Sequence, residues 1–163
     1  MADVSIRPAV PGDAAAIHAL IRELAEYERL TQLCTGSTAD LAAALFGPQP
    51  AAEVLLAEVD GGIAGFALFF HNFSTFLARR GLWLEDLYVR PVFRGHGVGS
   101  GLLRAVAAIA VNRRCGRFEW SVLDWNAPAI GFYERLGATV MPDWRIARVT
   151  GDALVHLGRP ASD

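Results

Sequence analysis

The segment that decides the fold is Arg94-Gly95-His96-Gly97-Val98-Gly99, which stands between the hydrophobic stretch Leu84–Val89 and an amphipathic stretch over 98–114. Three glycines at alternate positions let a ligand approach the main chain closely, because no Cβ is in the way. The first N–H groups of the helix that follows lack helical partners, and the helix dipole adds positive charge there. A strand, this loop and a helix together describe an anion site suited to a pyrophosphate. Taken alone, the loop is also compatible with a simple turn before a helix.

Hydrophobic periodicity on both sides of this loop predicts a mixture of strands and helices. The pattern is interrupted at Pro11-Gly12, at Asp60-Gly61-Gly62 and at Gly116. Asp13 is the expected N-cap of the first helix. We expect, in chain order, strand 4–8, helices 13–30 and 38–46, strands 53–59, 63–70 and 82–90, helix 98–114, strand 118–123, helix 127–136, and strands 144–150 and 153–157 around a Gly151-Asp152 turn. This order predicts a single domain over residues 1–163 of the α/β or α+β class.

The composition limits the possible classes of protein. The chain has 163 residues, of which 53% are hydrophobic and 20% charged, enough for one domain with a sizeable core. Its 15 basic and 17 acidic residues give a net charge of −2, so no global basic field exists to hold nucleic acid or an anionic membrane. All 15 basic residues are arginine, which excludes a Walker-type phosphate loop, a Schiff-base lysine and a pyridoxal enzyme.

Cysteine and histidine usage gives no sign of a metal site. Cys34 and Cys115 form no C-x-x-C pair, and the four histidines show no H-E-x-x-H spacing. The N-terminus lacks the features of a signal peptide, and the longest apolar run, 105–111, is far shorter than the roughly 20 residues of a membrane span. We therefore expect a cytoplasmic protein with no metal, no nucleic acid and no membrane among its partners.

A second segment, at residues 126–133, indicates more closely which family of proteins the chain resembles. Asn126–Tyr133 reads N-A-P-A-I-G-F-Y and opens a helix just after Trp120–Trp125. With R-x-x-G-x-G and N-x-P-A-x-x-F-Y together, the chain resembles the GNAT superfamily of acetyl-CoA-dependent N-acetyltransferases. Leu84–Val89, Trp125–Pro128 and Ile21–Glu28 are further similar to the spermidine/spermine and thialysine acetyltransferase branch.

The resemblance implies a GNAT fold, a mixed and mostly antiparallel twisted sheet flanked by helices and splayed where the cofactor enters. It also implies acetyl-CoA as cosubstrate, a small amine as acceptor and a homodimer. Contacts with the cofactor are expected at Leu87, Tyr88, Val89, Arg94, Gly95, His96, Gly97, Val98, Gly99, Ser100, Asn126, Ala129 and Tyr133. His96 is also interpretable as an ordinary solvent-exposed loop residue.

Acetyl transfer to an amine requires groups that accept and donate protons. Free alkylamines have a pKa near ~10.4, so most are protonated at pH 7 and must lose a proton before attack. Glu85, on the strand beside the loop, is our candidate acceptor of that proton, and N–H groups around Val89 are our candidates for stabilising the oxyanion. The departing thiolate, with a pKa near ~8.5, benefits from a proton, and Tyr133, with a pKa of ~10, can supply it. In similar enzymes the tyrosine at this position is the general acid.

The expected acceptor is the primary amine of a small cationic metabolite, such as a polyamine, thialysine or another lysine-like compound. Six acidic residues fall in or beside the segments expected to surround the acetyl group: Glu28, Glu85, Asp86, Glu119, Asp124 and Asp143. Of these we expect only Glu28 and Glu85 to face the amine. Contacts with the substrate are expected at Tyr27, Glu28, Glu85, Glu119, Trp120 and Ser121.

Other interpretations remain open from the sequence. The acceptor of an acetyl group could instead be a protein N-terminus or a lysine side chain, or the chain could be a CoA-binding module without turnover. Tyr133 is compatible with a core aromatic residue and Glu85 with a solvent-facing strand residue. Tyr27 and Glu28 are compatible with the ordinary end of a helix.

Overall fold

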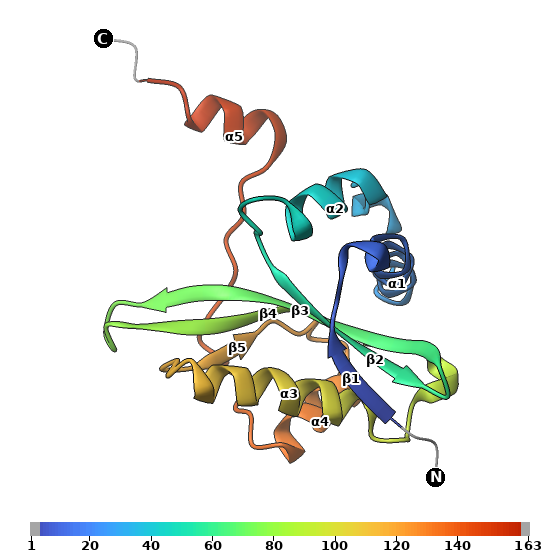
Figure 1. The fold of residues 1–163 in the computed structure, drawn as a ribbon. Helices are drawn as coiled ribbons and strands as arrows, with labels where there is room; N and C mark the ends of the chain where they lie inside the picture. Colours follow the sequence, from blue (N-terminus) through green and yellow to red (C-terminus); the bar gives the residue numbers. More distant parts are fainter. Residues whose placement is uncertain (1–3, 161–163) are drawn as a thin grey trace. The chain divides into compact units, whose positions relative to one another are not determined.

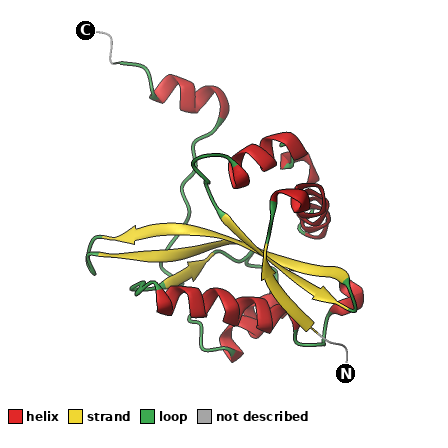
Figure 2. Cartoon of the chain, viewed as in Figure 1, coloured by secondary structure: helices red, strands yellow, loops and turns green. Residues whose placement is uncertain are grey.

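The structure is a computed structural model that describes residues 4–160. Residues 1–3, part of the N-terminus that predicts no signal peptide, lie outside the described residues. The chain divides into two compact units at the Ser121–Val122 bond, and the expected single domain stays a prediction. Figure 2 shows that the strands belong to the first unit and that the described regular structure after Val122 is helical.

A mixed sheet forms the centre of the first unit (Figure 1). Within the described residues it has the order β1-β2-β3-β4-β5, with β1 at Val4–Pro8, β2 at Glu53–Val59, β3 at Gly62–Ser74, β4 at Arg79–Val89 and β5 at Phe118–Trp120. The first four strands pair antiparallel and β5 pairs parallel to β4. The mostly antiparallel mixed sheet expected from the sequence is therefore confirmed.

Helices cover both faces of this sheet. Helices α1 (Ala14–Tyr27) and α2 (Thr38–Phe46) lie on one face and α3 (Val98–Asn112) on the other (Figure 1). Because both faces are covered, β2 carries four consecutive buried residues, Val54–Ala57, instead of alternating buried and exposed ones.

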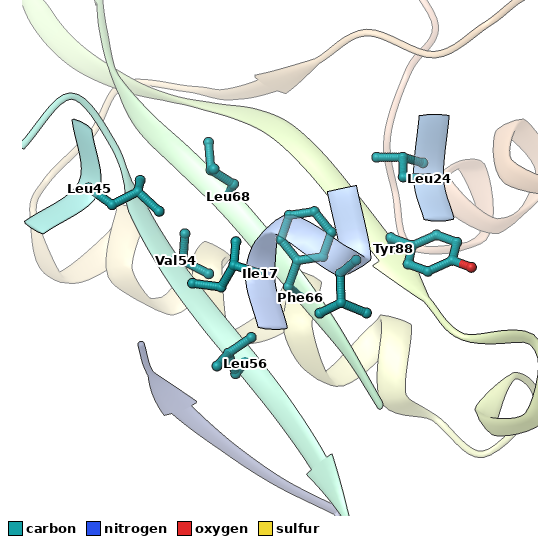
Figure 3. Packing of buried hydrophobic residues seen from close by; sticks show 9 residues of the cluster. Ile17, Leu24, Leu45, Val54, Leu56, Phe66, Leu68 and Tyr88 are labelled. Carbon is teal, nitrogen blue, oxygen red and sulfur yellow. The ribbon is translucent and has the colours of Figure 1, made fainter. Parts of the chain in front are cut away.

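The core under α1 and α2 fixes the position of α1 on the sheet. Figure 3 shows side chains of α1, α2, β2, β3 and β4 packed together there. The buried members are Ile17, Leu20, Leu24, Leu45, Val54, Leu56, Phe66, Leu68 and Tyr88. Leu24 and Tyr88 bring the last turns of α1 against the end of β4.

The start of α1 differs from the expected N-cap. Asp13 occupies the N-cap position, but its carboxylate makes no capping bond to the helix. It accepts hydrogen bonds from both terminal nitrogens of Arg7, at 2.8 and 3.0 Å, and from the Val10 N–H at 2.8 Å. A buried carboxylate gains more from a bidentate guanidinium than from one main-chain N–H, so the ion pair prevails over the cap.

β3 and β4 approach each other closely where Asn72 faces Gly81. The Asn72 Oδ1 atom is buried without a hydrogen-bond partner in the described structure. A Cβ added at Gly81 would collide with this oxygen and lie 3.1 Å from the Arg117 carbonyl oxygen, so the Asn72 side chain would have to move to admit it.

The second unit contains α4 (Ala127–Arg135) and α5 (Gly151–Leu157). The two closing strands expected at 144–150 and 153–157 are wrong: the first segment has no regular structure and the second lies within α5. Gly151 does not form a hairpin turn with Asp152, because the residues that follow build a local helix instead of pairing with another strand. None of the helices found between residues 4 and 160 is both long and apolar enough to cross a membrane.

Candidate functional site

The sheet opens at the middle of β4. β5 pairs with β4 only from Leu82 to Leu84, whereas β4 continues to Val89. Beyond Leu84, no strand of the described part of the first unit lies against this edge. The splay expected from the sequence is therefore present in the sheet itself.

A β-bulge at Glu85 marks the point of opening. Leu84 lies opposite Phe69 and Asp86 opposite Leu68, so Glu85 is an extra residue without a partner on β3. Such a bulge bends its strand and increases the local twist, and bulges are frequent beside active sites. Pairing with β5 thus ends next to the residue that bends β4.

The open edge of β4 presents main-chain groups of Leu87 and Val89. The Arg90 N–H donates to the Ala64 carbonyl on β3 at 2.9 Å. Main-chain groups alternate in direction along a strand, so those of Leu87 and Val89 point away from β3. The Val89 carbonyl accepts there from Arg94 Nε at 2.9 Å. This edge can supply N–H donors to an extended ligand or to a developing oxyanion.

The same bulge places Asp86 on the face covered by α1. Asp86 is opposite Leu68 and Tyr88 opposite Phe66, both members of the core under α1 and α2. Leu84 is opposite Phe69, which lies on the other face of β3 because neighbouring side chains alternate. Two even-numbered residues, Leu84 and Asp86, therefore face opposite sides of the sheet.

The Asp86 carboxylate lies near two others, those of Glu28 and Glu85, where α1 ends beside β4. Burial, and then the negative charges of Glu85 and Glu28, raise the pKa of Asp86 to about 7 from its ordinary 3.8. Burial also raises the pKa of Glu28, the C-cap residue of α1. Glu85 is exposed, and its Oε2 accepts from Trp83 Nε1 at 3.0 Å. Glu28 and Glu85 thus both lie near Asp86, a carboxylate that was not expected to face the amine, and whether Glu28 and Glu85 face the amine stays a prediction.

A bidentate ion pair fastens α1 to the end of β4. Arg90 donates to both Glu23 carboxylate oxygens at 2.9–3.2 Å and to the Ile63 carbonyl at 2.9 Å. Tyr27, one helical turn after Glu23, lies at the partly exposed end of α1. The end of α1, with Tyr27 and Glu28, is therefore held beside the end of β4, and their contacts with the substrate stay a prediction.

The backbone of the glycine loop favours glycine at two of its positions. Gly95 and Gly97 both have φ of +81°, in the left-handed region that favours glycine. A Cβ at Gly95 would meet nothing within 4 Å, and one at Gly97 only Ser100 Oγ at 3.9 Å. Space for a ligand is thus left in front of the first turn of α3, whose N–H groups are available to an anion. His96 is exposed in this loop, and a side chain there could contact a bound anion or remain in solvent.

The first unit ends at the end of β5, with Glu119, Trp120 and Ser121. The Glu119 carboxylate pairs with Arg117 Nε at 2.6 Å and accepts from Asn72 Nδ2 at 3.4 Å. Because Arg117 neutralises it, Glu119 adds little negative charge to the site. Trp120 pairs with Leu84, the last β4 residue before the bulge, so it lies next to the opening.

The second unit carries the remaining expected site residues on α4. Asn126 is buried, and its Oδ1 accepts from the Ala129 N–H at 3.4 Å, so its side chain caps α4. Tyr133 is half-buried, with its ring 5.3 Å from that of Phe132. In the part of the chain that is described, no cluster of three or more histidine, cysteine or acidic side chains could hold a metal.

Comparisons with known proteins agree with this geometry. Pig thialysine N-epsilon-acetyltransferase is 38% identical over 96% of this chain and 98% of its own length. L-ornithine N5-acetyltransferase of Arabidopsis thaliana is 38% identical over 94% of this chain and 87% of its own length. The solved structure of an integron cassette protein of V. cholerae superposes with a TM-score of 0.81 at 25% identity, covering 96% of this chain and 98% of that one.

The sequence model of the acetyltransferase (GNAT) family matches residues 16–138, which span β4, the glycine loop and α4. The motifs, the splayed mixed sheet and these matches agree, and the chain belongs to the acetyltransferase (GNAT) family.

Proposed function

We propose that this N-acetyltransferase moves the acetyl group of acetyl-CoA to the primary amine of a small cationic metabolite such as a polyamine, thialysine or ornithine. The observation that carries the proposal is the group of Glu28, Glu85 and Asp86 beside the open edge of β4. The relatives that act on thialysine and on L-ornithine support the same class of acceptor.

The carboxylates select a cation through their charge. Like charges in a poorly screened site repel by several kcal/mol, so an amine with a second positive centre is favoured and an anionic acceptor is penalised. Glu28 and Glu85 supply this field when ionised. A lysine-like acceptor also carries a carboxylate, which needs a cationic partner, and Arg79 and Arg80 at the start of β4 are exposed candidates.

Asp86 is the proposed acceptor of the amine proton. With a pKa of about 7 it is a stronger base than an ordinary aspartate, and about half of it is ionised at neutral pH. A base is most effective when its pKa lies near the working pH. Glu85, which the sequence favoured for this step, remains the second candidate and raises the pKa of Asp86 through its charge.

The other residues bind the cosubstrate and complete the transfer. The N–H groups around Gly97 and the first turn of α3 bind the pyrophosphate, and the open edge at Leu87 and Val89 binds the adjoining arm. The Val89 N–H stabilises the oxyanion that forms when the neutral amine attacks the thioester carbonyl. Tyr133 donates its proton to the departing CoA thiolate, and the carbon–sulfur bond breaks as the amide is released.

Release of free CoA thiol across an amine panel tests the proposal. We expect spermidine, thialysine and ornithine to react with a higher kcat/KM than butylamine, and peptides with a free N-terminus or a lysine to react least. Glu28→Gln should reduce the preference for dications, whereas Glu26→Gln, an exposed position on the same helix, should keep it. Equal rates for butylamine and the dications would refute the cation selectivity, and no thiol release with any amine would refute the activity.

We also propose a cytoplasmic homodimer. Cys34 and Cys115 are both free thiols, as expected in a reducing compartment. Leu154, Val155 and Leu157 are exposed on α5, and two-fold dimers are the commonest soluble assemblies. Light scattering should give twice the 17.6 kDa of one chain, and a mass of one chain at working concentration would contradict the dimer.

A further inference from the structure

We propose that Arg94, the first residue of R-x-x-G-x-G, is a positioning residue for the amine acceptor, because its guanidinium holds Tyr27 at the end of α1 against the end of β4. The motif alone suggests only a contact with the cofactor. The inference rests on the proposed function, since it concerns the acceptor side of that site.

The Arg94 side chain contacts three groups from two other elements. Its Cζ atom lies 5.0 Å from the centre of the Tyr27 ring and 5.7 Å from that of Tyr88. Its Nε donates to the Val89 carbonyl at 2.9 Å. Both ring distances are within the range of about 6 Å for a cation–π contact. A planar, weakly hydrated guanidinium can stack on such rings and donate in its own plane, which an ammonium cannot do equally well.

Two arginines, Arg90 and Arg94, contact the same side of α1. Arg90 holds Glu23, and Arg94, four residues later, contacts Tyr27, which is four residues after Glu23. Residues four apart lie on the same side of a helix, so the two arginines secure successive turns of α1. Arg90 makes several short hydrogen bonds and fixes the helix, whereas Arg94 fixes only its final residue.

The final residue of α1 matters because Glu28 follows it directly. The Glu28 carboxylate is close enough to Asp86 to raise its pKa. If the end of α1 shifts when the Arg94 contact is lost, Glu28, the next residue, moves relative to Asp86, and the field that selects the cationic acceptor changes with it. Loss of the Arg94 contact should thus weaken binding of the amine without removing the glycine loop that binds the pyrophosphate.

Arg94→Lys tests this role, because it keeps the charge near the loop and removes the planar stack. At saturating acetyl-CoA we expect the KM for the amine to rise about fivefold, the effect of losing one partly exposed cation–π contact. The Kd of CoA, measured by calorimetry, should stay within about twofold, which is less than 0.5 kcal/mol. Arg94→Gln should raise the KM for the amine at least as much.

A double-mutant cycle with Tyr27→Leu separates a joint role from two independent ones. If Arg94 acts through Tyr27, the variant with Arg94→Lys and Tyr27→Leu should have the amine KM of the worse single variant. Arg114→Gln, an exposed arginine just after α3, is the control for loss of a surface charge and should leave both constants unchanged.

Two results would overturn the inference while leaving the proposed function in place. One is an Arg94→Lys enzyme that binds CoA more weakly with an unchanged amine KM, which would make Arg94 a phosphate ligand only. The other is a double variant whose losses multiply, which would show that Arg94 and Tyr27 act separately. Wild-type protein that acetylates no amine would instead refute the proposed function.

Discussion

Replacing Asp86 by asparagine removes a charge and almost preserves the side-chain shape, so its effects can be derived from the surroundings of that residue. A pKa of about 7 against an ordinary 3.8 means that ionising Asp86 is harder in the folded protein than in the unfolded chain. The difference corresponds to a ceiling of about 4 kcal/mol. Water reaches this half-buried side chain, and screening reduces the expected effect to about 2 kcal/mol.

The sign follows from proton linkage. Because the folded protein binds this proton more tightly, ionisation of Asp86 destabilises the fold increasingly between pH 3.8 and about 7, and fully above that. Asp86→Asn should therefore raise the free energy of unfolding at pH 8 by about 2 kcal/mol, or the Tm by about 4–8 °C, and have a much smaller effect at pH 4. The same variant should lower kcat/KM at least about 10²-fold, because the base is lost.

Thermal melting at pH 4 and pH 8 and a pH profile of kcat/KM check both effects. Wild-type kcat/KM should rise with pH through about 7, and the Asp86→Asn profile should lack that inflection. Glu26→Gln, an exposed carboxylate on α1, is the control and should change neither measurement. An equal change in Tm at both pH values, or a wild-type profile without an inflection near 7, would refute the reasoning.

Three further substitutions test other parts of the structure. Tyr133→Phe keeps the aromatic ring but removes the proton donor, so kcat should fall about 10²-fold or more with the Kd of acetyl-CoA nearly unchanged; a near-normal kcat would make Tyr133 structural. Gly97→Val puts a β-branched side chain at φ +81° in the ligand space, and calorimetry should show at least about a tenfold loss of CoA affinity; unchanged affinity in a folded variant would refute the pyrophosphate site. Gly81→Ala sets a Cβ against Asn72 Oδ1 and near the Arg117 carbonyl, and thermal melting should show a loss of about 1–3 kcal/mol; a Tm equal to wild type would mean that the Asn72 side chain moves aside at no cost.

Local features of the site could be predicted from the sequence. The left-handed glycines of the loop and the cap at Asn126 are set by residues within a few positions of each other, and the structure has both. The order of the elements indicated only the α/β or α+β class, and the mixed, mostly antiparallel sheet was expected from the family resemblance. The closing strands could not be predicted in the same way, because a strand needs a partner distant in the sequence, whereas α5 forms from neighbouring residues alone.

The face of β4 on which Asp86 lies could not be predicted from the sequence, for a different reason. Leu82, Leu84 and Tyr88 are buried and even-numbered, so alternation assigns them all to one face of β4. The bulge at Glu85 places Leu84 and Tyr88 on opposite faces. Buried residues occur both before and after the exposed Glu85, so alternation alone gives no sign of the change of face. Only the pairing register shows that Asp86 lies under α1 with Glu28.

The opening of the sheet therefore depends on how many residues β4 contains, not only on which residues they are. A chain with Glu85 deleted would pair regularly with β3 from Leu84 to Asp86, and Asp86 would keep its face. Without the bulge, β4 would lose the local bend that begins where its pairing with β5 ends, and the edge at Val89 would no longer turn away from the line of β5. A one-residue deletion should thus abolish cosubstrate binding while the proton acceptor stays in place, an outcome that no substitution at Glu85 would reproduce. Homologous chains are accordingly expected to keep the length of this segment even where its residue types change.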